Sequence, residues 1–449
     1  MRLAAIGSLD RDLVSVGLTL CATTVLTLAY TTLGTRLLGP SAAGDFLAVV
    51  FLLAFVVQAA GPLGGTASRF AAQYVEHGRL DALSGLSNDL VRLTLRLLLW
   101  LAAPVVALGA FGVSVGGAAS GALWVLAVAA AVILTFVTLD RGLLRGLSRF
   151  STFNKTLVVE SGSRFVFGLA LLLLFRSTWA AVGGYVVGAA FALAFTRRRL
   201  SVEIGGSAKA IPDRPGSEGE LFRFLAPMAV VAAAYGAVQN LDVLIVRHGF
   251  PGQAAAYGAS AVLAHVATML VTPFSTTLLP RAAALHGRHG ALGREAVVQL
   301  LRHASGYVAL CVLAAGAFAL AGDGLVVGLY GPDFADGGAW LAPLTASIAL
   351  GGVCLLATQS LAAHGCFGFL APVLVSCVLG LAAVFGWAAT PASVISGLFA
   401  VKLVLLALLA WPLSRAYRAD RRSTSGPPNA GSPSPDTAIE AGGIGGVER

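Results

Sequence analysis

Long apolar segments separated by short polar loops make up most of the chain. A helix needs about 20 mostly apolar residues to cross the hydrocarbon core of a bilayer. Segments of this length predict about twelve spans, over residues 13–35, 42–66, 91–113, 117–139, 154–175, 178–196, 222–246, 255–279, 303–321, 339–363, 368–389 and 392–413. The pattern therefore predicts an all-α, polytopic membrane protein.

Lysine and arginine fall mainly in every second loop. They cluster over residues 141–155 and 197–223, for example, while Arg36, Arg176 and Arg247 are the basic residues predicted on the opposite side. Cytoplasmic loops of membrane proteins carry the excess of basic residues. The alternation therefore predicts a multi-pass protein of the plasma membrane with both termini in the cytoplasm.

The composition agrees with a membrane protein, because 57% of the residues are hydrophobic and 11% are charged, against about 25% charged in soluble domains. The net charge of +9 is explained by basic residues in the loops, which set the orientation of the protein in the membrane. Nucleic acid is therefore excluded as a partner. The cysteines lie in apolar segments, with no CxxC pair and no histidine cluster at metal spacing. No metal and no cofactor is expected, and membrane lipids are expected as partners.

Two polar segments divide the chain. Residues 200–220 form the longest internal loop and are predicted to be a cytoplasmic linker between an N-terminal lobe, residues 1–199, and a C-terminal lobe, residues 221–413. Residues 414–449 are rich in proline, glycine and serine. Such a segment cannot bury a core, so a disordered cytoplasmic tail is predicted there.

One short pattern occurs in both halves of the chain. Residues 35–46 read TRLLGPSAAGDF and residues 246–257 read VRHGFPGQAAAY. An arginine, a proline and an aromatic residue recur at an interval of 211 residues (247−36 = 211), as Arg36 and Arg247, Pro40 and Pro251, and Phe46 and Tyr257. The alternative explanation of this match is chance, because a proline and an aromatic residue are common in the loop after an apolar segment. A duplication with an even number of spans predicts two parallel-repeat six-helix lobes with a cavity between them.

Five motifs follow one another along the chain: RLLGPSAAGDF, NLDVLIV, AAAYGASAVL, LLPRAA and LYGPDFADGGAWLAPL. In this order the sequence resembles the polysaccharide biosynthesis flippases of the multidrug/oligosaccharidyl-lipid/polysaccharide exporter superfamily. The resemblance implies a transporter that moves an undecaprenyl-pyrophosphate-linked oligosaccharide from the cytoplasmic to the outer leaflet by alternating access. It also implies polysaccharide-assembly proteins as partners.

Charged residues inside the predicted spans are candidates for substrate binding, because a charge in the membrane interior usually faces a cavity or a partner. Arg164 lies near the middle of the fifth span and Lys402 near the middle of the twelfth. Both cations suit a pyrophosphate group. The alternatives are an ion pair of Arg164 with Glu160, one helical turn away, and a Lys402 side chain that extends to the membrane surface.

Four further arginines are predicted near span ends. Arg92 and Arg96 begin the third span and form a candidate entry patch for substrate head groups, or contact ordinary lipid phosphates. Arg36 and Arg247 occupy equivalent outer ends of the two lobes, and are predicted to anchor the helices or to form an outer gate.

Asp242 in the seventh span is the candidate for ion coupling. Tyr235 and Gln239 share its helix face and are candidate cavity-lining residues. A buried carboxylate can take up and release a proton, so a proton or sodium gradient is the expected driving force. The alternative is an ion pair of Asp242 with Arg247 or a contact with a neighbouring helix.

Threonines at four-residue spacing mark the first span, and a similar stripe occurs in the eighth. Thr23, Thr27 and Thr268 are therefore candidate cavity-lining residues. Hydrogen bonds from these hydroxyls to carbonyl groups of their own helix are the alternative.

Three other functions compete with the flippase. A multidrug or toxin cation antiporter on the same fold would favour a dominant acidic site, whereas the interior charges here lean basic. A polysaccharide polymerase or ligase would need a sizeable extramembrane loop with paired carboxylates or histidines, and no predicted loop is that long. A scaffold without transport activity is the third. The sequence thus favours a transporter over an enzyme.

Overall fold

The computed structural model describes residues 2–76, 83–110, 121–204, 218–266, 294–363 and 368–424. Throughout these ranges the regular secondary structure is helical. Nine helical stretches in the described part of the chain are long and apolar enough to cross a membrane, and the first of them, 62 residues long, has room for two spans. The predicted all-α, polytopic membrane fold is confirmed.

The first two predicted spans form one helical element, α1 (Arg2–Glu76), with a sharp kink at Gly39. Gly39 has a φ of 71° and a ψ of 170°, in a region that glycine adopts without a steric penalty. Pro40 follows and has no N–H group to continue the first helix. The kink therefore separates the two predicted spans, 13–35 and 42–66, within α1.

The remaining helices of the N-terminal half pack on α1 and on one another. The fifth predicted span is continuous but changes from α- to π-helix for five residues and back. The elements are α2 (Leu83–Ala110), α3 (Gly121–Gly146), α4 (Phe150–Ser163), the π-helix η2 (Arg164–Gly168), α5 (Leu169–Phe175) and α6 (Thr178–Ile204).

The C-terminal half begins with a helix that is interrupted at Leu241, in the outward half of the predicted seventh span. Its elements are α7 (Glu218–Asn240), α8 (Asp242–Gly249), α9 (Ala254–Ala264), α11 (Arg294–Tyr330), the 3₁₀ helix η3 (Pro332–Gly337), α12 (Gly338–Ala363), α13 (Leu370–Trp387) and α14 (Pro391–Thr424). The break between α8 and α9 falls at Pro251, in the second copy of the repeated pattern.

The predicted start of the disordered tail at Ser414 was wrong, because α14 continues to Thr424. Residues 414–424 read SRAYRADRRST, with alanine and arginine as good helix formers and neither glycine nor proline. The composition that predicted disorder begins at Gly426, and residues 425–449 lie outside the described part of the chain.

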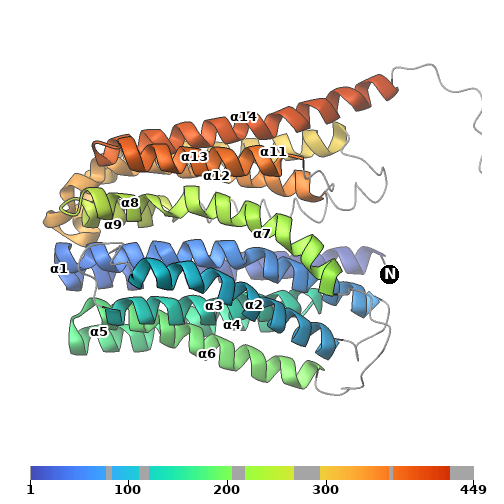
Figure 1. Cartoon of the computed structure of the whole chain (residues 1–449), viewed down its shortest axis with the longest axis horizontal. Helices are drawn as coiled ribbons and strands as arrows, with labels where there is room; N and C mark the ends of the chain where they lie inside the picture. The colour runs from blue at the N-terminus through green and yellow to red at the C-terminus, as the bar shows by residue number, and fades with distance from the viewer. Residues whose placement is uncertain are drawn as a thin grey trace, which may run out of the picture.

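The helices form two bundles, with α1–α6 in one layer and α7–α14 in the other (Figure 1). The N-terminus, the start of α7 and the end of α14 lie at the same end of the molecule, so both bundles begin in the same direction (Figure 1). The part of α1 after the kink packs against α7, α8 and α9 and joins the bundles.

Candidate functional site

Asp242 lies at the start of α8, directly after the break in the seventh span, and is only 4% exposed. The hydroxyl of Tyr257 on α9 donates a hydrogen bond to its Oδ2 atom over 2.9 Å. The Oδ1 atom has no partner among the described residues. The alternative pairing with Arg247 is not formed, because Arg247 binds another carboxylate, that of Asp45.

Lys402 on α14 is 3% exposed, and its Nζ atom donates to Ser347 Oγ on α12 over 3.0 Å. Its charge interacts with the carboxylate of Asp242. The side chain therefore does not extend to the membrane surface, and this alternative is excluded. Lys402, Asp242 and His265 lie within electrostatic range of one another in the C-terminal bundle, and with Tyr257 and Ser347 they are called its buried polar cluster below.

The N-terminal bundle has its own buried polar cluster. Glu160 on α4 binds Arg164 at the start of η2, and its other carboxylate oxygen is 2.9 Å from Arg141 Nη1 on α3. The guanidinium of Arg164, in a residue 6% exposed, lies 4.2 Å from the centroid of the Tyr185 ring on α6. The predicted pair of Glu160 and Arg164 is formed, but it is part of a larger network.

Helix α6 approaches this cluster closely at Gly188. A Cβ atom there would lie 2.8 Å from Arg164 Cβ and 2.9 Å from the Glu160 carbonyl oxygen. Glycine therefore permits the contact between α6 and the π-helical turn. π-Helical turns are rare and often occur at functional sites.

The two candidate cations for substrate binding make their contacts inside separate bundles. Arg164 and Lys402 lie in separate bundles, and both are buried. The physical reason is that a buried charge needs partners, and each finds them within its own bundle, Glu160 for Arg164 and Ser347 for Lys402. Substrate binding by either residue stays a prediction.

The candidate cavity-lining threonines bond to their own helix. Thr23 donates to the Leu20 carbonyl over 3.1 Å and Thr27 to the Thr23 carbonyl over 2.9 Å. These bonds agree with the alternative explanation of the stripe. Thr268 lies outside the described residues.

Tyr235 and Gln239 are buried in α7. The amide nitrogen of Gln239 is 3.4 Å from the Ile348 carbonyl oxygen of α12. Both predicted cavity-lining side chains thus pack inside the C-terminal bundle.

Arg92 and Arg96 both lie on exposed positions of α2 and do not join the two buried clusters.

The arginines of the repeated pattern have different surroundings. Arg36 is exposed, whereas Arg247 makes a two-nitrogen contact with Asp45 Oδ1, through Nε and Nη2, both at 2.8 Å. This ion pair joins the two bundles at the predicted outer end. Gly44, beside Asp45, lies against Ala254. A Cβ atom added to Gly44 would be 3.6 Å from the Ala254 Cβ atom, which is an ordinary van der Waals contact.

A second polar contact joins the bundles deeper inside. Asn240 Nδ2 at the end of α7 donates to Gln58 Oε1 on α1 over 2.8 Å. Nearer the opposite end, the guanidinium of Arg69 lies 4.4 Å from the Phe224 ring centroid. Between these polar contacts the bundles pack through apolar side chains, such as Leu47 against Gly258 and Phe51 beside His265.

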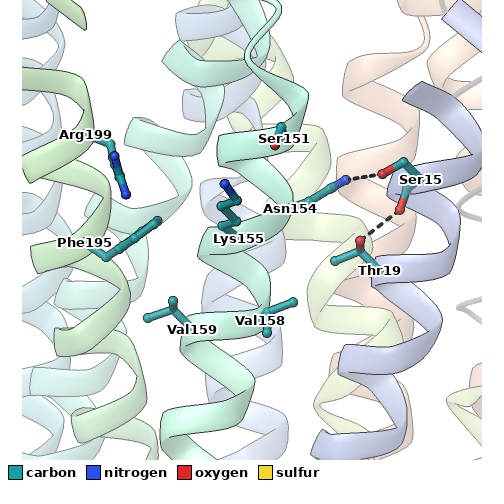
Figure 2. Close-up of a pocket in the computed structure, with 9 residues that line it drawn as sticks. All are labelled: Ser15, Thr19, Ser151, Asn154, Lys155, Val158, Val159, Phe195 and Arg199. Carbon is teal, nitrogen blue, oxygen red and sulfur yellow. Dashed lines mark hydrogen bonds between the residues drawn. The ribbon is translucent and has the colours of Figure 1, made fainter. Parts of the chain in front are cut away.

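A groove of about 490 Å³ lies between the first part of α1, α4 and α6. Figure 2 shows α4 in the middle with Asn154 and Lys155, flanked by Ser15 on α1 and Arg199 on α6. From the sequence, Lys155 and Arg199 were identified only as basic residues of predicted cytoplasmic loops. Helical spacing alone could not show that α4 and α6 bring these two cations to one groove.

The partners of the buried charges were missed for a similar reason. Arg141, Tyr257 and Ser347 reach Glu160, Asp242 and Lys402 from different helices. Only the pair one helical turn apart was visible in the sequence. A polar residue within an apolar span is the one available signal, and it does not identify the partner.

No protein-family model and no curated protein matches the sequence. Solved structures do match its fold. An inward-facing multidrug resistance MATE family transporter of the MOP superfamily aligns with a TM-score of 0.72 and 14% identity, over 90% of this chain and 96% of that structure. An outward-facing multidrug resistance MATE family transporter aligns with a TM-score of 0.65 and 16% identity, over 92% and 96%.

A MOP superfamily transporter from Pyrococcus furiosus, described as having a binding pocket of reverse polarity, aligns with a TM-score of 0.60 and 14% identity, over 90% of this chain and 96% of that structure. The chain therefore has the fold of MOP superfamily transporters. Membership of the superfamily expected from the sequence motifs, and of its polysaccharide flippase branch, stays a prediction.

Proposed function

We propose that this protein is an alternating-access transporter that moves a polyprenyl-pyrophosphate-linked oligosaccharide across the plasma membrane for surface polysaccharide biosynthesis. The observation that carries the transport step is the joining face between the bundles. Asp45 with Arg247, and Gln58 with Asn240, are side-chain pairs that can separate without unfolding either bundle. The fold shared with transporters favours transport over a polymerase or ligase activity.

The ion pair of Asp45 and Arg247 is proposed to hold the outer end closed while substrate enters from the cytoplasm. The larger TM-score with the inward-facing transporter supports this assignment. The bundles then rock about the face formed by α1 and α7, and the outer pair breaks. The two termini are expected on the cytoplasmic side.

The choice of substrate follows from the order of the five sequence motifs and from the excess of basic residues in the predicted cytoplasmic loops, which suits an anionic head group. Polysaccharide-assembly proteins are the expected partners, and a proton or sodium gradient is the expected energy source.

A cation antiporter is the second candidate, and Asp242 favours it. Its buried carboxylate has one oxygen without a partner among the described residues. Such a group can bind a proton or a cationic substrate. Two of the similar structures are described as multidrug resistance transporters.

The deciding experiment reconstitutes the purified full chain in liposomes. A polyprenyl-pyrophosphate-linked sugar is loaded in one leaflet, and its appearance in the other is followed with a lectin. In parallel, efflux of ethidium is measured under a proton or sodium gradient. Transfer of the lipid-linked sugar above protein-free liposomes supports the flippase. Ethidium efflux without sugar transfer would reject it in favour of the antiporter.

A further inference from the structure

We propose that the groove between α1, α4 and α6 binds an anionic lipid of the cytoplasmic leaflet, with the lipid phosphate at Lys155 and Arg199 and a hydroxyl-bearing head group at Asn154. This site is separate from both buried clusters. The proposal concerns lipid binding alone, so it does not depend on whether the protein transports a lipid-linked sugar.

The charge of the groove favours an anion. Lys155 on α4 and Arg199 on α6 are both exposed and line it from two sides (Figure 2). The guanidinium of Arg199 lies 5.3 Å from the centroid of the Phe195 ring, one helical turn earlier. Among the described residues that line the groove, none is acidic. Two cations without a carboxylate match a phosphate group.

Asn154 supplies the second observation. Its side chain lines the groove although the residue is only 8% exposed. Its Nδ2 atom donates to Ser15 Oγ over 2.9 Å, while Oδ1 has no partner among the described residues. A buried acceptor without a donor is unfavourable. A hydroxyl group of the bound head group, such as that of a glycerol, would supply the missing donor.

Apolar side chains continue the groove toward the membrane interior. Val158, Val159 and Phe195 form its apolar wall. One turn further along α6, about 6 Å at 1.5 Å per residue, exposed Phe191 stacks on exposed Phe167, with ring centroids 5.2 Å apart and planes 7° apart. This apolar path suits a lipid chain and gives a free phosphate ion no contact. The occupant is therefore a lipid.

The site lies where the cytoplasmic leaflet is predicted. Ser15, Lys155 and Arg199 are near the start of α1, the start of α4 and the end of α6, respectively. These helix ends lie on the side that the positive-inside rule assigns to the cytoplasm. The head group of a lipid in that leaflet can thus reach both cations while its chains lie along α4 and α6.

Native mass spectrometry of the detergent-purified full chain tests the proposal. The protein is titrated with phosphatidylglycerol, which carries the phosphate charge and a glycerol, and with zwitterionic phosphatidylcholine. Wild-type protein is expected to bind phosphatidylglycerol more tightly. The Lys155→Gln/Arg199→Gln double variant is expected to lose about ten-fold in affinity for it. Arg198→Gln is the matched control, because Arg198 is an exposed neighbour on α6 that does not line the groove.

A second variant, Val158→Asp, introduces a carboxylate on the apolar wall without removing a cation, and is expected to weaken phosphatidylglycerol binding. Equal affinity of wild type and double variant would overturn the proposal, as would equal binding of the two lipids. Full competition by inorganic phosphate would show a free-anion site and also reject it. Sugar transfer in liposomes is measured separately, so an empty groove leaves the flippase proposal standing.

Discussion

At the scale of single residues, Glu160, Arg164 and Lys402 are buried and have polar partners within their own bundles. Glu160 lies between Arg141 and Arg164, and Lys402 is bonded to Ser347. Taking a charge out of water is costly unless partners replace the lost solvation. The polar residues of the spans therefore have a structural role that is testable before any transport assay.

Glu160→Gln is expected to destabilise the protein strongly, because it leaves two arginines beside a neutral amide. Removal of one partner of a buried ion pair typically costs about 3–5 kcal/mol. Thermal unfolding of the detergent-purified protein, followed by intrinsic fluorescence, measures the change. Asp336→Asn is the control, since it also turns a carboxylate into an amide, but at an exposed position of η3. Equal midpoints for Glu160→Gln and wild type would show that the network contributes little.

Tyr257→Phe removes the hydroxyl that donates to Asp242 and leaves this buried carboxylate without the bond. The expected loss of stability is about 1–3 kcal/mol. The control is Tyr330→Phe, whose hydroxyl takes part in a longer contact of 3.4 Å with Thr32. The same unfolding assay compares the two. A larger loss for Tyr330→Phe would contradict the assigned importance of the Asp242 contact.

At the scale of helices, α6 is positioned by its close approach to α4 and η2. Gly188→Ala places a Cβ atom 2.8 Å from Arg164 Cβ, so the helices must shift, at a cost of about 1–3 kcal/mol. Gly183→Ala is the control on the same helix, because its nearest atom, Leu171 Cδ1, would be 3.7 Å away. Unfolding midpoints that fall equally for both variants would argue against this packing constraint.

At the scale of the whole molecule, the ion pair of Asp45 and Arg247 is expected to bias the equilibrium between closed and open outer ends. Arg247→Gln removes the pair, while Arg36→Gln changes the equivalent exposed residue of the other bundle. A pair of this kind contributes about 1 kcal/mol, which is roughly a five-fold change in population.

The population change is measured by labelling a cysteine at the joining face with a membrane-impermeant maleimide. Ala255 is suitable because it is buried beside Gly44. The Ala255→Cys substitution is introduced together with Cys21→Ser, since Cys21 is exposed. Labelling is expected to be several-fold faster with Arg247→Gln than with Arg36→Gln. Equal rates would mean that the ion pair does not control opening.

The sequence by itself determined the helices and two of the breaks between them. The length of an apolar segment predicts a span. Gly39 with Pro40, and Pro251, interrupt the helices. Both effects depend only on neighbouring residues in the sequence. The fold class and the approximate positions of the described spans followed from these local rules, although several helices extend well beyond the predicted spans, such as α11 (Arg294–Tyr330) beyond 303–321. The tail was misjudged because composition averaged over residues 414–449 hid a helical start.

Only the tertiary structure decided which polar residues meet. Arg141 reaches Glu160 from α3 and Ser347 reaches Lys402 from α12. Lys155 and Arg199 share a groove although 44 residues separate them in the sequence (199−155 = 44). Such contacts depend on how helices rotate and pack against one another. A helix shows its own periodicity in the sequence, but its partner atoms come from segments whose placement is set by the packing of the whole bundle.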